Sequence, residues 1–183
     1  MKVIVAITGA SGAIYARHTL EQLIASSEVE RIALIVSEQA QQVIPFEGIT
    51  LPDSEKIIRY DNRDMFSAVA SGSASWDAMV IVPASMGTVG RVASGVSLSL
   101  IERAADVVLK ERRRLVVVVR ETPYSLIHLR NMTTLTEAGA IILPASPSFY
   151  SLPTTIDEAV QTVVERIISH IGIAAPHFEF DGK

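Results

Sequence analysis

Short apolar runs alternate with stretches of helical periodicity along most of the chain. Runs with little polar alternation occupy residues 2–7, 31–36, 78–82, 115–119 and 140–143. Such runs are typical of strands that are covered on both faces. Strands that alternate with helices predict right-handed βαβ crossovers and a parallel sheet. The pattern therefore predicts an α/β fold: a three-layer, doubly wound open parallel sheet of the Rossmann or flavodoxin-like type, with residues 1–183 forming a single domain.

Helical periodicity predicts helices over residues 14–26, 38–44, 99–110 and 126–137, and one that begins near residue 155. The spacing of Ser99 to Glu102 and of Thr155 to Glu158 fits a capping box at a helix start. Gly139 fits the position just after a helix end. Residues 45–64 mix Pro, Gly, Asp and Asn with little periodicity, which predicts a long irregular loop of the kind that often has a function.

Each predicted strand ends in a short polar turn, and these turns share one edge of a parallel sheet. In an open α/β sheet, ligands bind at that edge, where the strand order reverses. The first turn, Gly9-Ala10-Ser11-Gly12, has little side-chain bulk, so a ligand can approach the N-terminus of the following helix, where the dipole favours an anion. A tight strand-to-helix connection that binds nothing remains the alternative for this turn.

Composition excludes several classes of site. The chain has no cysteine, and its histidines, His18, His128, His170 and His177, show no metal-ligand spacing, so no metal is expected. A net charge of −4 gives no nucleic-acid footprint. Hydrophobic residues make up 49% of the chain, yet no apolar run spans a membrane and no secretory signal is evident, so we expect a cytoplasmic protein that buries its apolar surface in the sheet and between subunits.

The strand-end turns supply hydroxyls, backbone N–H groups and an Arg120-Glu121 pair. This set suits a mononucleotide better than a dinucleotide. The first turn lacks the third glycine of G-x-G-x-x-G, and the second strand ends at Ser37 instead of the acidic residue that would hold an adenosine ribose.

Four motifs in order resemble those of the UbiX-type flavin prenyltransferase family, which includes phenylacrylic-acid-decarboxylase-associated flavoproteins. They are Gly9-Ala10-Ser11-Gly12-Ala13-Ile14-Tyr15, Ser85-Met86-Gly87-Thr88, the run from Arg103 to Arg113, and Arg120-Glu121-Thr122-Pro123. The resemblance spans nearly the whole chain.

The resemblance implies an enzyme that transfers a dimethylallyl group from dimethylallyl monophosphate to reduced FMN. Bonds form at flavin N5 and C6, and the prenylated FMN serves a UbiD-type decarboxylase. The family uses no metal and forms homododecamers. Ubiquinone synthesis and aromatic acid decarboxylation are both compatible pathways, and the phosphate count of the donor stays open.

The resemblance also assigns residues to roles. The flavin contacts fall on Gly9, Ala10, Ser11, Ser37, Ser85, Met86, Gly87, Thr88 and Arg120. The isoprenyl phosphate contacts fall on Tyr150, Arg166, Lys110 and Arg120. The catalytic residues are Glu121, Ser11, Lys110 and Glu47.

Simpler interpretations remain for some of these residues. Arg166 fits a snorkelling surface residue, and Tyr150 fits a core aromatic. Arg120 and Glu121 fit a surface ion pair. The chain departs from some relatives by having Met65 where they have Trp, and by ending in residues 178–183 without Trp. Both differences concern the cover over the prenyl chain.

Two other functions compete with prenyl transfer. One is an FMN-dependent decarboxylase of the homo-oligomeric Cys-decarboxylase type. That group has a Pro-x-Met-Asn turn and an active-site His, whereas this chain has Pro83-Ala84-Ser85-Met86 and no matching His. The other is a non-enzymatic FMN carrier. It has no second phosphate to bind, so it would leave four residues without a function: Lys110, Arg120, Glu121 and Arg166. For prenyl transfer itself, Glu121 and the departing phosphate both stay open as the final base.

Overall fold

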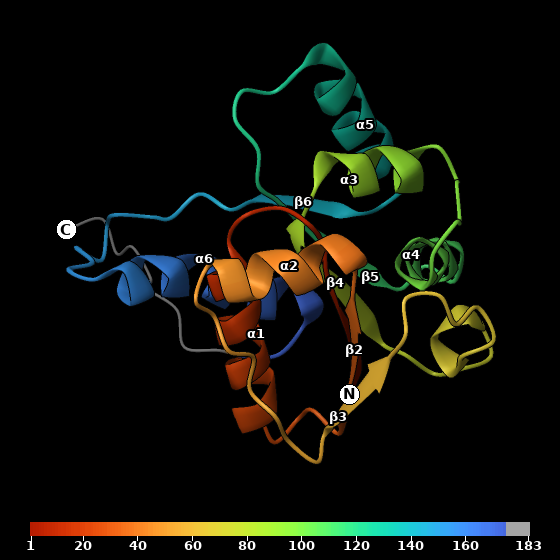
Figure 1. The fold of residues 1–183 in the computed structure, drawn as a ribbon, viewed down its shortest axis with the longest axis horizontal. Helices are drawn as coiled ribbons and strands as arrows, with labels where there is room; N and C mark the ends of the chain where they lie inside the picture. The colour runs from red at the N-terminus through yellow and green to blue at the C-terminus, as the bar shows by residue number, and fades with distance from the viewer. Residues whose placement is uncertain (175–183) are drawn as a thin grey trace.

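Within residues 1–174, which the computed structural model describes, six parallel strands form one sheet. The strand order is β3-β2-β1-β4-β5-β6, a doubly wound order in which five of the strands correspond to the predicted apolar runs. Figure 1 shows the sheet with helices packed around it. The strands are β1 (Lys2–Ile7), β2 (Arg31–Val36), β3 (Ile57–Tyr60), β4 (Ala78–Ala84), β5 (Arg114–Val119) and β6 (Ile141–Pro144).

Helices cover both faces of this sheet, so the fold has three layers. They are α1 (Ala13–Ala25), α2 (Glu38–Phe46), α3 (Met86–Ala93), α4 (Leu100–Lys110), α5 (Leu126–Glu137) and α6 (Ile156–Ile171), with a short 3-10 turn at Ala68–Ala70. On one face, Val3 and Val5 pack with apolar residues of α1 and α6. On the other face, Ile4 and Ala6 pack with α3, α4 and α5. The alternation follows from the two-residue period of a strand.

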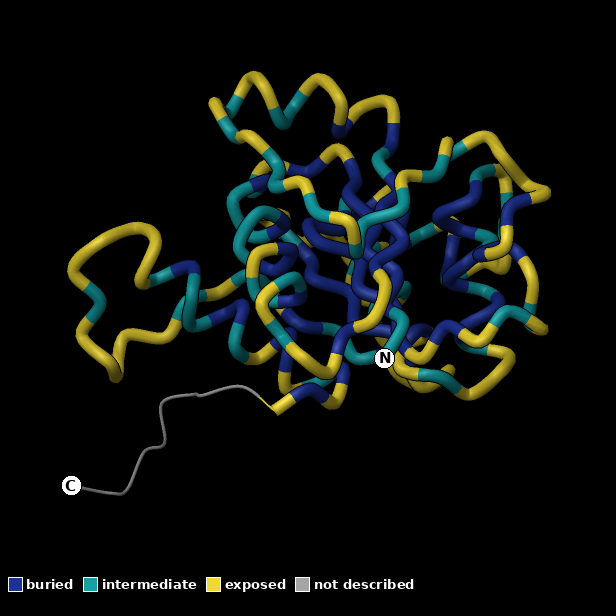
Figure 2. The backbone as a smooth tube through the Cα atoms, turned by 90° about the horizontal axis from the view of Figure 1, so that it is seen from below, coloured by how far each residue is buried: buried dark blue, intermediate teal, exposed yellow. Residues whose placement is uncertain are grey.

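The sheet is buried at its centre, whereas the exposed backbone lies in the outer segments (Figure 2). Residues 3–7 of β1 are all buried, as expected for a central strand of a doubly wound sheet. The apolar runs of the sequence therefore correspond to strands that are covered on both sides.

The predicted helix signals are confirmed. Ser99 and Glu102 form a capping box at the start of α4, and Thr155 and Glu158 form one at the start of α6. Gly139 follows the C-cap of α5 with φ 101°, a left-handed conformation that glycine adopts without strain.

Two elements differ from the sequence-based expectation. Residues 57–60, within the expected loop of residues 45–64, form the edge strand β3. Residues 86–93, which begin inside the expected turn of residues 83–88, form α3 although Gly87 and Gly90 disfavour a helix. Packing of Val89 and Val92 in the core stabilises α3, which shows how tertiary contacts override local propensity. The departure expected at residues 178–183 lies outside the described residues, and His177 does too.

Candidate active site at the carboxyl edge of the sheet

The turns after β1 and β4 are joined to each other at the point where the strand order reverses. The backbone N–H and the Oγ1 hydroxyl of Thr8 both donate to the carbonyl oxygen of Pro83, at 3.2 and 2.8 Å. The N–H of Ser85 donates to Thr8 Oγ1 at 2.7 Å. Because Thr8 is buried, these bonds fix the two turns relative to each other without exposure to water.

A cavity of about 550 Å³ opens beside these turns. Four of the predicted contact residues line it: Gly9, Ser37, Ser85 and Thr88. A Cβ atom at Gly9 would lie 2.5 Å from Cβ of Gln39, so only glycine fits at this position. The cavity therefore has small residues and hydroxyls along its wall, a surface suited to a phosphorylated ligand.

Two helices begin at this cavity with serine caps. Ser37 Oγ accepts a hydrogen bond of 3.1 Å from the N–H of Ala40 at the start of α2. Ser85 Oγ accepts one of 3.4 Å from the N–H of Thr88 at the start of α3. The positive ends of both helix dipoles and their first backbone N–H groups favour an anion here. Ala10 and Met86, also predicted contacts, are buried beside these turns.

The N-terminus of α1, in contrast, already holds an anion from the chain itself. Glu47 accepts hydrogen bonds from the N–H of Gly12 at 2.9 Å and from the N–H of Ala13 at 2.7 Å. The expectation that this helix start offers its N–H groups to a ligand is therefore wrong. The carboxylate of Glu47 accepts hydrogen bonds from them instead.

Burial of the Glu47 carboxyl would raise its pKa, but hydrogen bonds from Ser11, Gly12 and Ala13 and the charge of Arg120 outweigh burial. The net effect holds the pKa of Glu47 below its ordinary value. Glu47 is therefore an anion at neutral pH, with no proton to donate.

Arg120 connects the end of β5 to the same group. Its Nε donates to the carbonyl oxygen of Ser11 at 3.1 Å, and its charge acts on Glu47. The neighbouring Glu121 is exposed, and its carboxylate accepts a 2.9 Å hydrogen bond from the N–H of Thr122. Four residues predicted from the sequence, Ser11, Glu47, Arg120 and Glu121, thus lie at one edge of the sheet.

Arg166 lies beside the carboxyl end of the neighbouring strand, β6. It lines a cavity of about 260 Å³ together with Leu143 and Pro144. Arg166 forms no ion pair with any residue of the described chain, and its Nη2 lies 3.4 Å from Nε2 of His170. Burial and the charge of Arg166 lower the pKa of His170, which favours a neutral ring. Tyr150 belongs to the segment between β6 and α6 and is 74% exposed, so the core-aromatic interpretation of Tyr150 is wrong.

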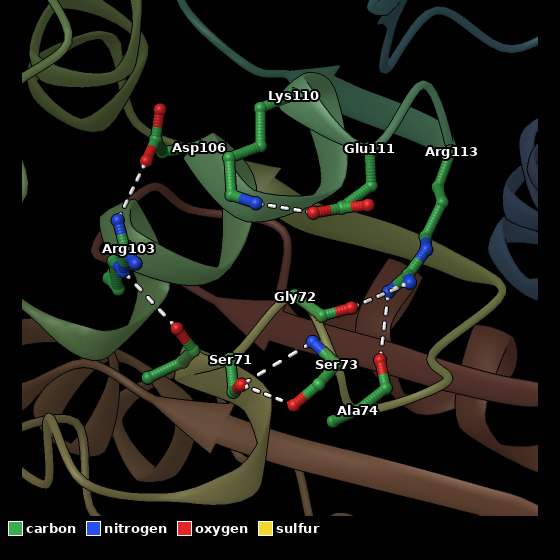
Figure 3. A network of polar contacts seen from close by, with 10 residues as sticks. Ser71, Gly72, Ser73, Ala74, Arg103, Asp106, Lys110, Glu111 and Arg113 are labelled. Carbon is green, nitrogen blue, oxygen red and sulfur yellow. Dashed lines mark hydrogen bonds and ion pairs between the residues drawn. The ribbon is translucent and has the colours of Figure 1, made fainter.

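Lys110 lies at the opposite edge of the sheet. It ends α4 just before β5 begins, whereas Arg120 follows the end of β5. The six residues of β5 separate the two edges by about 20 Å. Lys110 pairs with Glu111, next to Gly72 (Figure 3). A single chain therefore does not bring Lys110 to Arg120 and Arg166.

Around Lys110, side chains of α4 and of the turn before β5 hold the loop at residues 71–74 (Figure 3). Arg113 donates to the carbonyl oxygens of Gly72 and Ala74, each at 2.9 Å. Arg103 donates to the carbonyl oxygen of Ala70 at 3.2 Å. Two of the cations here are paired with carboxylates, Arg103 with Asp106 and Lys110 with Glu111.

Sequence reasoning missed all four charged residues that line the 550 Å³ cavity: Glu38, Arg63, Arg91 of α3 and Glu102 of α4. The capping box identified Glu102 only as a helix-start residue. Nothing in the spacing of the chain links it to Arg91, because the two helices meet only through the tertiary fold.

Among residues 1–174, no group of three or more His, Asp or Glu side chains is arranged to hold a metal ion. In the same part of the chain, no helix has both the length and the apolar character needed to cross a membrane.

The chain is similar to known flavoproteins. A family model described as Flavoprotein matches residues 1–172. The flavin prenyltransferase UbiX of Methanocaldococcus jannaschii is 44% identical over 176 residues, which cover 94% of each chain.

Two solved structures are similar over most of the chain. A dodecameric FMN-dependent UbiX-like decarboxylase from Escherichia coli O157:H7 superposes with a TM-score of 0.92, at 36% identity and 100% coverage of both chains. AnUbiX in complex with FMN and dimethylallyl pyrophosphate superposes with a TM-score of 0.86, at 39% identity, over 94% of this chain and 92% of that one.

Proposed function

The chain belongs to the UbiX family of flavin prenyltransferases, and we propose that it joins a dimethylallyl group from dimethylallyl monophosphate to N5 and C6 of reduced FMN. One observation carries the proposal: the cavity at Gly9, Ser37, Ser85 and Thr88 opens at the switch point of the sheet. Arg120, held to Ser11, lies at the same edge.

The cavity supports FMN as the flavin. The serine-capped starts of α2 and α3 suit its phosphate. The turns at Gly9–Ser11 and Ser85–Thr88 leave room for the rest of the FMN molecule to lie against their backbone. When bound, reduced FMN supplies the nucleophilic ring atoms.

Cations around the second phosphate would promote departure of the leaving group. Charge accumulates on that phosphate as its C–O bond breaks, so fixed cations stabilise the transition state more than the ground state. Arg120 and Arg166 lie at the carboxyl ends of the adjacent strands β5 and β6. We assign them, with the hydroxyl of Tyr150, to binding of the donor phosphate.

Lys110 can join this set only from another copy of the chain. Several apolar side chains near the carboxyl edge of the sheet are exposed, and they support extensive self-association: Leu126, Ile127, Phe149 and Leu152. A homododecamer in which a second subunit places Lys110 in the cleft would explain both the distant position of Lys110 in the single chain and the exposed apolar side chains.

We assign different roles to the carboxylates of Glu121 and Glu47. Glu121 is exposed at the end of β5 and is the proposed group that removes the proton from C6 or passes it to the departing phosphate. Glu47 is bound to the start of α1 and is ionised, so we now assign it to positioning of Ser11 and Arg120. The side chain of Ser11 hydrogen-bonds to Glu47, and we assign its hydroxyl to relaying a proton.

The product would be consumed by a UbiD-type decarboxylase, for which it is the cofactor. The direct test uses purified protein, reduced FMN and dimethylallyl monophosphate without added metal. A flavin that is heavier by one five-carbon unit supports the proposal, whereas unchanged FMN with a loaded, folded protein contradicts it.

A further inference from the structure

Arg91 of α3 and Glu102 of α4 form an ion pair at the wall of the large cavity. Arg91 Nε donates to Glu102 Oε1. The Arg91 side chain is 44% exposed and the Glu102 side chain only 3%. The guanidinium is therefore the accessible half of the pair, and the carboxylate is the buried half.

Glu102 is held in place independently of Arg91. Its Oε2 accepts hydrogen bonds from the N–H groups of Leu98 at 2.7 Å and Ser99 at 3.0 Å. A buried carboxylate with these donors has little freedom to move. It therefore gives Arg91 a fixed partner, so the position of the guanidinium is set before any ligand arrives.

The guanidinium lies against the start of α3. Its Nη2 donates to Thr88 Oγ1 at 3.3 Å, and Thr88 Oγ1 lies 3.1 Å from Ser85 Oγ. Its Nη1 lies 3.4 Å from the position that a Cβ at Gly87 would occupy. In the described chain, Nη1 makes no hydrogen bond. Nη1 of Arg91 can therefore donate to a ligand beside Ser85 and Thr88, the residues at the start of α3.

The cavity has a second arginine, Arg63, but its surroundings differ. Arg63 is 78% exposed and is paired with two exposed carboxylates, Asp61 and Glu38. Water screens such a pair, and its side chains reorient easily. Arg91, by contrast, has its geometry fixed from the protein interior.

A phosphate monoester at the starts of α2 and α3 would carry between one and two negative charges. Helix dipoles supply only about half a charge each, so a fixed cation adds substantially to recognition of that phosphate. Arginine also presents its donors in a planar fork that matches phosphate oxygens.

We propose that Arg91 is a specificity residue for the phosphate of FMN, and that Glu102 is its positioning residue. The inference rests on the proposed flavin site. It would explain why the protein binds FMN more tightly than riboflavin, which is the same flavin without the phosphate.

The test compares the dissociation constants of oxidised FMN and riboflavin, measured by quenching of flavin fluorescence. Arg91→Gln should weaken FMN binding about 10- to 100-fold, the range expected for a charge-assisted hydrogen bond. Riboflavin binding should change by less than about twofold. Glu102→Gln should weaken FMN binding by a smaller factor, because the guanidinium remains but loses its fixed position.

Arg31→Gln is the matched control. It removes the same charge from the start of β2, at the opposite edge of the sheet, where Arg31 pairs with Glu30. Both dissociation constants should stay at the wild-type values. Arg91→Lys should give an intermediate loss of FMN affinity, and it provides a second variant if Arg91→Gln does not fold.

Equal loss of affinity for both flavins in Arg91→Gln would mean that Arg91 only supports the fold, and would overturn the proposal. Wild-type affinity for FMN in that variant would overturn it too. If the wild-type protein prefers FMN in the expected way but makes no prenylated flavin, the proposed function fails while this inference stands.

Discussion

The carboxylate of Glu47 accepts a hydrogen bond of 2.7 Å from the backbone N–H of Ala13, at the first turn of α1. A residue from the end of α2 therefore occupies the helix N-terminus where a doubly wound fold commonly binds phosphate. For this reason we assign the phosphate of FMN to the starts of α2 and α3 in our proposal. The contact also couples Glu47 to the turn that carries Ser11.

Glu47→Gln should destabilise the fold by about 1 kcal/mol at pH 7, the usual contribution of one hydrogen bond. The folded state lowers the pKa of Glu47 from 4.5, so its contribution is present above pH 4.5 and is lost as the pH falls through the folded-state pKa. Urea unfolding at several pH values should show that the free energies of unfolding of wild type and Glu47→Gln become equal in acid.

Glu55→Gln is the control for that experiment, because Glu55 is exposed and makes no hydrogen bond or ion pair within residues 1–174. A stability difference between wild type and Glu47→Gln that stays constant from neutral to acid pH would show that the charge of Glu47 has no part in it.

Gly9→Ala should cost about 1–3 kcal/mol of stability through overpacking, because the new Cβ would lie 2.5 Å from Cβ of Gln39. Gly87→Ala is the matched variant. Its Cβ would meet only the flexible end of Arg91, at 3.4 Å, and alanine favours the helix by up to about 1 kcal/mol. Denaturant unfolding of both variants checks this contrast, which fails if Gly9→Ala is as stable as Gly87→Ala.

The central strands and the larger helices could be predicted because their signals are local. The apolar runs of β1, β2, β4 and β5 and the capping boxes of α4 and α6 need no distant contact to be recognised. The edge strand β3 was missed because its four residues are only partly buried and lie within a polar stretch. α3 was missed because Gly87 and Gly90 interrupt the helical pattern of its sequence.

The site was predictable where it consists of strand-end turns, since parallel strands must bring these turns to one edge. Contacts between helices were not predictable. Glu47 and Ala13 are 34 positions apart, and the Arg91–Glu102 pair forms only when α3 packs beside α4. Lys110 could be recognised as part of a motif, and the predicted order of helix, strand and Arg120 already places Lys110 and Arg120 at opposite ends of β5.

If a second subunit supplies Lys110, two inactive variants should restore each other. Lys110→Met and Arg120→Ala alone should each lose most prenyl transfer. In mixed oligomers assembled from both, about one quarter of the clefts would combine a normal Arg120 with a normal Lys110 from a neighbour. Activity should therefore return when the two variants are co-expressed, and measured product formation checks it.

Arg120→Ala mixed with Glu121→Gln is the control pair. Both residues follow β5 in the same chain, so mixing creates no intact cleft and no activity should return. Absence of recovery in the first pair would rule out a Lys110 shared between subunits. Recovery in the control pair would show that restored activity does not depend on the position of Lys110.

Glu121→Gln keeps the shape of the side chain and removes its ionisable group. We expect unchanged FMN affinity and a slower formation of product, by about 100-fold or more, the upper part of the usual range for acid–base catalysis. Stopped-flow absorbance under anaerobic conditions measures the rate. A wild-type rate would identify the departing phosphate as the base instead.

The most direct measurement is the mass of the flavin released after anaerobic incubation with reduced FMN and dimethylallyl monophosphate in EDTA. Wild-type protein should convert FMN into a species heavier by one five-carbon unit, and Arg120→Ala, with FMN bound, should convert little. Recovery of unmodified FMN from folded, flavin-loaded wild-type protein would contradict the assignment of prenyl transfer to this cleft.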